Sequence, residues 1–216
     1  MHDHNKIVIW RHGQTDWNIE NRFQGSTDIP LNETGKAQVA RAGKLLTGLS
    51  PNQIIASDLS RAFNTARALA DLIDLEVTPD KRLRETDGGN WEGKTGDKIR
   101  ETDIENFIRW IDGDDNPAGQ IGERRSDVAR RATSAINEAL AGKTNHTLVV
   151  ATHGGTARCI IGSMLNLPMT AWGSIGGLSN AAWSILSTTP RGWNLVEHNS
   201  GSLPEPIFGE ESGGEN

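Results

Sequence analysis

Short runs of consecutive apolar residues recur along the chain, separated by stretches with apolar residues at helical spacing. The runs at 7–10, 54–56 and 147–151 have the length of buried strands, and the first and third are soon followed by glycine. Residues 34–47, the segment after Asp58 and the segment after Ser126 show helical spacing, and Ser126 is a candidate N-cap. This alternation predicts an α/β fold: a three-layer sandwich in which helices flank a mostly parallel central sheet.

Residues 88–125 depart from this alternation. They contain the Gly88–Gly89 pair, a predicted helix near 96–112 and a stretch of Gly, Asp, Asn and Pro at 112–122. We expect this segment to be a lid-like insertion over one end of the sheet. Trp110 within it could stack on a sugar, but the favoured interpretation is that it fills the core of the insertion.

The end of the chain has two further features. Apolar runs at 182–186 and 193–196 flank Pro190–Gly192, which predicts a C-terminal β-hairpin. Residues 203–216 hold four Glu and no Lys or Arg, and we expect them to form a disordered acidic tail. The preceding residues, 1–202, are expected to form a single domain.

Composition excludes several classes of function. The 216 residues carry a net charge of −6, which argues against a nucleic-acid binder but not against a pocket for one small anion. No apolar stretch approaches the roughly 20 residues of a membrane helix, and no secretory signal is visible, so a cytoplasmic protein with no membrane partner is expected. The single cysteine, Cys159, suits a reducing compartment. There is no Tyr, so acid–base roles fall to His, Asp, Glu, Lys or Cys.

Charged and polar residues follow the ends of the predicted strands. The carboxyl ends of parallel strands meet at one edge of a sheet, where ligands bind in open α/β folds. The segment from 76 to 78 is expected to lead to the same edge. The residues that these strands deliver are Arg11, His12, Arg61, Glu85 and His153.

This set of residues suits phosphoryl transfer. Two guanidiniums can hold the non-bridging oxygens of a phosphate, one imidazole can act as nucleophile, and the second can add a hydrogen bond. A carboxylic acid can protonate the leaving oxygen and later take a proton from water. No metal or other cofactor is expected, since the set needs none and no metal-ligand motif is found.

Each residue also has a structural interpretation. His12 could be a satisfied core histidine, Arg11 a member of a surface ion pair, and His153 a cap at the end of a strand. Glu85 could be a solvated loop acid. Asp58, which also follows a strand, is expected to cap the next helix rather than take part in chemistry. The joint occurrence of the set at strand ends favours the functional interpretation.

A long ordered series of motifs is similar to the histidine phosphatase superfamily, which includes phosphoglycerate mutases. The similarity extends over about residues 6–200. Its first motif, Arg-His-Gly-Gln-Thr-Asp-Trp-Asn, occupies positions 11–18. The remaining motifs are at 22–25, 28–35, 57–62, 83–85, 89–93 and 152–155.

The resemblance implies a role for each matching position. His12 would be the phosphorylated nucleophile and Glu85 the proton donor, while Arg11, Arg61 and His153 would complete the phosphate pocket. Asn18, Gln24 and the backbone N–H of Gly154 would assist phosphate or substrate binding. The implied partner is a small phosphorylated substrate, and because relatives are often dimers, a homodimer is a candidate state.

The branch within the family depends on the insertion. Cofactor-dependent mutases carry an adjacent Arg pair there, whereas Arg100 and Arg109 are separated. An adjacent pair, Arg124–Arg125, follows Glu123, but in the family this position holds a Gly-Glu-Ser stretch that begins a helix. We therefore do not expect this pair to be equivalent to the Arg pair of the mutases. A phosphatase is therefore favoured over a mutase, with a non-catalytic phosphate-binding module as a third alternative. Stretches at 83–86, 91–93 and 175–183 resemble actinobacterial enzymes, which makes glucosyl-3-phosphoglycerate a candidate substrate.

Overall fold

The computed structural model describes residues 4–201, so the predicted tail at 203–216 lies outside the described residues. Six strands form one sheet in the order β3-β2-β4-β1-β5-β6. The strands β3, β2, β4 and β1 pair in parallel, whereas β5 pairs antiparallel with both β1 and β6. In chain order the strands are β1 (Lys6–Arg11), β2 (Gln53–Ala56), β3 (Val77–Pro79), β4 (Thr147–Thr152), β5 (Trp183–Thr189) and β6 (Gly192–Ser200).

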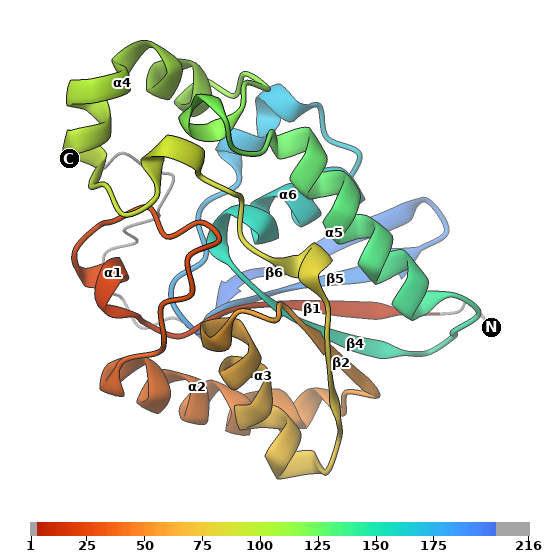
Figure 1. The fold of residues 1–216 in the computed structure, drawn as a ribbon. Helices are drawn as coiled ribbons and strands as arrows, with labels where there is room; N and C mark the ends of the chain where they lie inside the picture. The colour runs from red at the N-terminus through yellow and green to blue at the C-terminus, as the bar shows by residue number, and fades with distance from the viewer. Residues whose placement is uncertain (1–3, 202–216) are drawn as a thin grey trace.

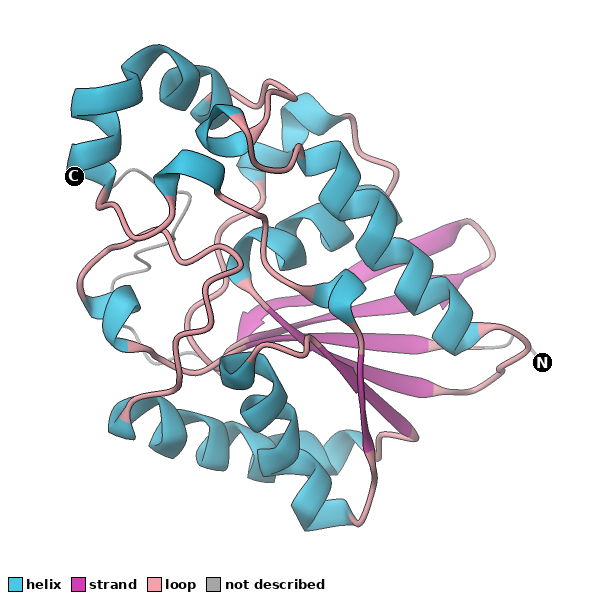
Figure 2. Ribbon diagram, in the orientation of Figure 1, coloured by secondary structure: helices cyan, strands magenta, loops and turns pink. Residues whose placement is uncertain are grey.

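Helices cover both faces of this sheet, as Figures 1 and 2 show. The pair α2 and α3 packs on one face and the pair α5 and α6 on the other. The predicted three-layer α/β architecture and the β5–β6 hairpin are confirmed. The helices are α1 (Asp16–Ile19), α2 (Glu33–Leu46), α3 (Ser60–Ile73), α4 (Gly96–Ile111), α5 (Arg125–Leu140) and α6 (Gly154–Met164). Short 3-10 segments are η1 (Thr47–Leu49), η2 (Lys81–Leu83), η3 (Gly89–Trp91), η4 (Ala118–Gln120) and η5 (Met169–Ser174).

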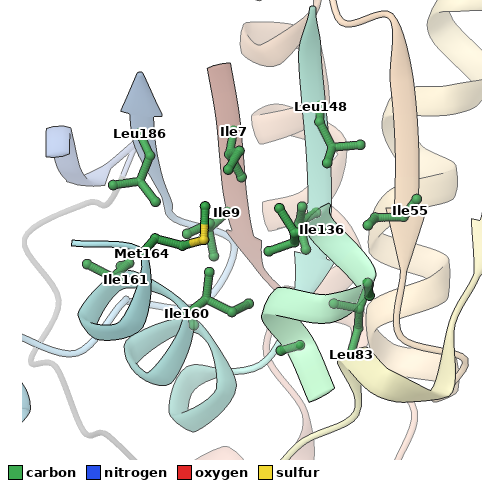
Figure 3. Close-up of a cluster of buried hydrophobic side chains, with 14 of the residues drawn as sticks. Ile7, Ile9, Ile55, Leu83, Ile136, Leu148, Ile160, Ile161, Met164 and Leu186 are labelled. Atoms are coloured by element: carbon green, nitrogen blue, oxygen red, sulfur yellow. The ribbon is translucent and has the colours of Figure 1, made fainter. Parts of the chain in front are cut away.

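The core lies in two layers, one on each side of the sheet. Successive residues of a strand point to opposite faces, so Ile7 and Ile9 of β1 pack toward α5 and α6, whereas Val8 and Trp10 pack toward α2 and α3. Figure 3 shows the first layer, in which Ile136 of α5 meets the side chains of the sheet. Burial on both faces explains why these strands are continuous apolar runs.

The insertion has a small core of its own. Trp91 contacts the rings of Phe23, Phe107 and Trp110 edge to face, and Trp110 is fully buried, as the favoured interpretation of that residue required. Helix α4 is kinked at Asp103, whose carboxylate accepts a hydrogen bond of 2.8 Å from Trp91 Nε1. These contacts give the segment a fixed shape beside the sheet.

The predicted N-cap of α5 is wrong. The helix begins at Arg125, one residue before Ser126, and Arg124 occupies the cap position without a side-chain bond. Instead the carboxylate of Asp115 accepts hydrogen bonds from the N–H of Ser126 at 3.1 Å and from its hydroxyl at 2.6 Å. A carboxylate from the insertion therefore satisfies the N-terminal N–H group that a local cap would have taken.

Candidate active site at the carboxyl edge of the sheet

The pairing of β1 with β4 brings the two histidines together. In this parallel register Arg11 lies opposite Thr152, so the next residues, His12 and His153, leave the sheet side by side. The N–H of His12 donates to Thr152 O at 3.0 Å, and the two imidazole centroids are 5.2 Å apart. The convergence that strand ends predicted is present in the structure.

His12 is held in one tautomer. Its side chain is fully buried, and Nδ1 lies 2.7 Å from the carbonyl oxygen of Gly13. Because a carbonyl can only accept, Nδ1 carries the proton and Nε2 keeps a lone pair. Nε2 has no hydrogen-bond partner among residues 4–201. The imidazole ring thus presents one lone pair, on Nε2, and the hydrogen bond at Nδ1 fixes the orientation of the ring.

Arg11 supplies positive charge beside this nitrogen. It donates through Nη1 to the carbonyl of Leu178, while its buried Nε and Nη2 have no partner within the described part of the chain. The guanidinium lies against Gly154, where a Cβ would be 3.4 Å from Nε. Buried donors without partners are costly, so their presence next to His12 indicates a site for an anion.

Arg61 and His153 are coupled to each other. Nε of Arg61 donates to Nδ1 of His153 at 3.1 Å, so the proton of the imidazole is on Nε2, 2.9 Å from the hydroxyl of Ser57. The guanidinium of Arg61 also donates to the carbonyls of Gly25 and Thr27, each at 2.8 Å. His153 is thus in contact with Arg61 and Ser57 through its two nitrogens.

Burial and positive charge keep both imidazoles neutral. Burial is the largest cause that lowers the pKa of His12 well below 6.5, followed by the charges of Arg61 and Arg11. Burial, followed by Arg61, lowers the pKa of His153 in the same way. The nearby arginines therefore stabilise the unprotonated form that a nucleophilic nitrogen requires.

Glu85 is buried at the amino end of α6, not solvated as its structural interpretation supposed. Only 2% of the residue is exposed. Its Oε1 accepts from the N–H of Thr86 and from the N–H and hydroxyl of Thr156, at 2.8, 3.0 and 3.1 Å. Among residues 4–201, Oε2 accepts only from the N–H of Gly155, at 3.0 Å. The asymmetry leaves Oε2 as the oxygen with room for a proton.

Asn18 and Gln24 belong to a polar network next to His12. Oδ1 of Asn18 accepts from Thr15 and, at 3.1 Å, from Asn180, whose Nδ2 also lies 3.3 Å from the carbonyl of His12. Oε1 of Gln24 accepts from the Thr15 hydroxyl at 3.1 Å. These two amides are joined to the backbone of His12 through Thr15 and Asn180.

Sequence reasoning missed several partners of the predicted residues. Asn180 comes from the loop before β5, within a stretch that resembles actinobacterial enzymes, and that resemblance assigns Asn180 no role. Thr65 of α3 accepts from the N–H of Gly13 at 3.2 Å. Ser57 follows β2 directly, so the strand-end rule that found His12 could have found it too, whereas Thr156 is the third residue of α6.

The prediction that Asp58 caps α3 is wrong. Leu59 occupies the cap position, and Asp28 from a distant loop accepts from the N–H of Ser60 at 2.8 Å. Asp58 instead forms a bidentate ion pair with Arg84, with both N–O distances 2.7 Å. The hydrogen bonds from Arg84 hold the pKa of Asp58 below its usual value. Arg84 thus binds the carboxylate that the first turn of α3 was expected to use.

Arginines of the insertion are engaged away from the two histidines. Arg109 pairs with Asp114 at 2.9 Å, and Arg100 lies over the ring of Phe107. Arg125 stacks on Trp110, with its Cζ 4.0 Å from the ring centroid, and Arg124 donates to the carbonyl of Asp115. The Arg124–Arg125 pair thus fastens the insertion to α5.

Residues 4–201 lack two other kinds of feature. No group of three or more His, Cys, Asp and Glu side chains in this part of the chain is arranged to hold a metal ion. No helix within the same residues is both long and apolar enough to cross a membrane.

Comparison with known proteins adds independent findings. The model of the histidine phosphatase superfamily (branch 1) matches residues 7–201. Glucosyl-3-phosphoglycerate phosphatase of Mycobacterium tuberculosis is 36% identical over 190 residues, covering 84% of this chain and 85% of that one. Phosphoserine phosphatase 1 of Hydrogenobacter thermophilus is 30% identical over 186 residues, covering 86% and 88%. A structure of mycobacterial glucosyl-3-phosphoglycerate phosphatase with VO3 superposes with a TM-score of 0.85 at 36% identity, covering 90% of this chain and 98% of that one.

Proposed function

The chain belongs to the histidine phosphatase superfamily and is a phosphatase, and from this premise we propose that it hydrolyses a small phosphorylated metabolite through a phosphohistidine on His12. One observation carries the proposal. The buried Nε2 of His12 keeps a lone pair because Nδ1 is committed to Gly13 O, and Arg11, whose charge acts on this imidazole, has two buried donors without partners among residues 4–201.

In the first half-reaction the lone pair of His12 Nε2 attacks phosphorus while the bond from phosphorus to the leaving oxygen breaks. Arg11 and Arg61 bind the non-bridging oxygens and neutralise their charge. His153 holds Arg61 in place through Nδ1 and so completes the phosphate pocket. Glu85, protonated on Oε2, gives its proton to the leaving oxygen, and the alcohol departs.

In the second half-reaction water attacks the phosphohistidine. The Glu85 carboxylate takes a proton from the water, the bond from phosphorus to Nε2 breaks, and inorganic phosphate leaves with His12 again neutral. We expect the N–H of Gly154, in the first turn of α6, to donate to the phosphate, since helix N-termini favour negative charge. Asn18 and Gln24, through the network around Thr15, orient the backbone on which His12 sits.

The candidate substrates are a sugar phosphate or a phosphoglycerate derivative, with glucosyl-3-phosphoglycerate as the first to test. The glucosyl-3-phosphoglycerate phosphatases that resemble this chain support that choice. The engagement of Arg124 and Arg125 with the insertion favours hydrolysis over mutase activity, since an adjacent pair is then not available to hold a substrate carboxylate.

Phosphate release tests this proposal across phosphorylated sugars, glycerates, serine and nucleotides, with and without EDTA. We expect turnover of at least one sugar or glycerate ester that EDTA leaves unchanged, because the side chains alone supply nucleophile, charge and acid. Loss of all turnover in EDTA would contradict the metal-independent mechanism. Interconversion of 3- and 2-phosphoglycerate with a bisphosphate primer, without net phosphate release, would indicate the mutase. Binding of a phosphorylated ligand without turnover would indicate the non-catalytic module.

The pKa of His12 makes a prediction about pH. Burial and two arginines lower this pKa in the folded protein, whereas the unfolded chain has the ordinary value of 6.5. The unfolded state therefore binds more protons below pH 6.5, and the free energy of unfolding falls as the pH drops from 6.5 toward the folded pKa. We expect the His12 ring signals in an NMR titration to show no protonation until the pH is well below 6.5. A His12 midpoint at or above 6.5 would contradict this account.

Two further properties are proposed, an oligomeric state and a site of action. The outer edge of β6 offers a strand along which a second copy could pair, which supports a homodimer, and sedimentation velocity distinguishes dimer from monomer. The single cysteine supports a cytoplasmic site of action, which fractionation of cells would test.

A further inference from the structure

The backbone that carries Glu85 is not part of a strand or helix. It runs from η2 to η3, and residues 85–88 have no regular secondary structure. On one side the carboxyl group of Glu85 is bound to the amino end of α6. On the other side the backbone faces α5, and its carbonyl groups need donors that a sheet would otherwise have supplied.

Arg131 of α5 provides these donors with its entire guanidinium. Its Nη1 donates to the carbonyls of Arg82 at 2.6 Å and Arg84 at 2.8 Å, and its Nη2 donates to the carbonyl of Glu85 itself at 3.0 Å. The two remaining N–H groups, on Nε and Nη2, each donate at 2.8 Å to a carboxylate oxygen of Glu123. All five N–H groups are thereby used, and three of them bind the chain that leads into Glu85.

Glu123 ties down the residues just after Glu85. Its Oε2 accepts from the N–H of Asp87 at 3.0 Å, and its own N–H donates to the carbonyl of Asp87 at 2.9 Å. Burial opposes the charged form of Glu123, but the hydrogen bonds and charge of Arg131 outweigh it and lower its pKa below the usual value. The side chains of Arg131 and Glu123 are only 19% and 28% exposed, so solvent screens this ion pair less than a surface pair.

We propose that the Arg131–Glu123 pair is a positioning device for the proton donor, which sets the distance from Glu85 Oε2 to the leaving oxygen. Neither side chain touches the reacting atoms. They act by clamping the backbone on both sides of Glu85, at Arg82, Arg84, Glu85 and Asp87. This inference rests on the proposed function, in which Glu85 is the general acid.

A structural role alone would predict a different outcome. If the pair merely joined α5 to η2, its loss would lower stability and would reduce the turnover of all substrates alike. A positioning role instead predicts a loss that grows with the basicity of the leaving group, since only a basic leaving oxygen needs a proton as its bond breaks. A comparison of substrates whose leaving groups differ in basicity therefore distinguishes the structural role from the positioning role.

The test compares kcat/KM for phenyl phosphate and for 2,4-dinitrophenyl phosphate, whose leaving oxygen needs no acid. The variants are Arg131→Lys, which keeps the charge but cannot make five directed bonds, and Glu123→Gln, which removes the paired carboxylate. We expect a fall of about 10- to 100-fold for phenyl phosphate, part of the contribution of a general acid. The value for 2,4-dinitrophenyl phosphate should change by less than about threefold, since that reaction does not use the acid.

Glu138→Gln is the matched control. Glu138 also joins α5 to η2, through Arg82 at 2.8 Å, but it makes no contact with residues 84–87 in the structure. This control should leave the ratio of the two substrates unchanged. An equal loss for both substrates in the Arg131 and Glu123 variants, or no loss, would overturn the proposal.

The proposed function is tested separately in the wild-type protein. If wild-type enzyme forms no phosphohistidine on His12, the proposed function fails before any variant is examined. If it forms one and Glu85→Gln shows the expected dependence on leaving group, but Arg131→Lys and Glu123→Gln do not, only the positioning inference fails. Should Arg131→Lys not fold, Glu123→Gln decides between the two outcomes by the same ratio.

Discussion

Replacing His12 with glutamine is expected to reduce kcat by at least about 10⁴-fold, the scale seen when a covalent nucleophile is removed from an enzyme. Glutamine fills much of the same space but offers no nucleophilic nitrogen, because an amide nitrogen has no available lone pair. The residual rate would come from Arg11 and Arg61, which still hold the phosphate. Initial rates of phosphate release with the best substrate of the panel measure the loss.

His146→Gln is the matched control for this variant. His146 precedes the opposite end of β4, where its Nε2 lies 3.2 Å from Gln53, far along the sheet from His153. Its activity should remain within about twofold of wild type, since surface substitutions away from the site have small effects. Full activity in His12→Gln would show that another residue is the nucleophile.

The second large effect is expected for Glu85→Gln. Removal of the general acid should lower kcat/KM for alkyl and phenyl phosphates by about 10²- to 10⁴-fold, with a much smaller effect for 2,4-dinitrophenyl phosphate. Stability should fall as well, because the amide NH2 would face the N–H of Gly155 or Thr156, which donate at 3.0 Å to the carboxylate. Leaving one buried donor unpaired costs about 1–3 kcal/mol.

Two measurements separate these effects of Glu85→Gln. Denaturant unfolding gives the change in the free energy of unfolding, and rates at low temperature with both leaving groups give the change in catalysis. Equal rates for wild type and variant with phenyl phosphate would move the acid role to another carboxylate, of which Asp87 is the nearest in sequence.

The strand ends could be predicted because they depend on local patterns. Continuous apolar runs fixed β1, β2 and β4, and parallel strands must deliver the residues that follow to one edge. Arg11, His12 and His153 were found in this way. The predicted convergence of Glu85 also holds, although β3 is only three residues long and the approach of Glu85 to the site depends on α6.

The errors share one physical cause. Asp58 and Ser126 were expected to cap helices because they precede helical patterns, yet distant carboxylates, Asp28 and Asp115, accept from the first turns of α3 and α5. Tertiary contacts of this kind leave no periodic signal in the sequence. The same holds for Asn180, which reaches His12 and Asn18 from a loop more than 160 residues away.

The tautomer of His12 is likewise a property of the folded chain alone. The sequence places Gly13 next to His12 but does not say which nitrogen its carbonyl will meet. In the folded protein the carbonyl meets Nδ1, and this single contact assigns the nucleophilic role to Nε2. The choice of the nucleophilic nitrogen thus depends on backbone geometry, which the identities of the single residues do not reveal.

The most direct test of the account is to quench wild-type enzyme during turnover of a ³²P-labelled substrate and locate the label. We predict an acid-labile, base-stable phosphoryl group on the peptide that contains His12, attached to Nε2, and its absence in His12→Gln. Absence of any covalent phosphate during turnover, or a label on Nδ1 of His12 or on His153, would contradict the account.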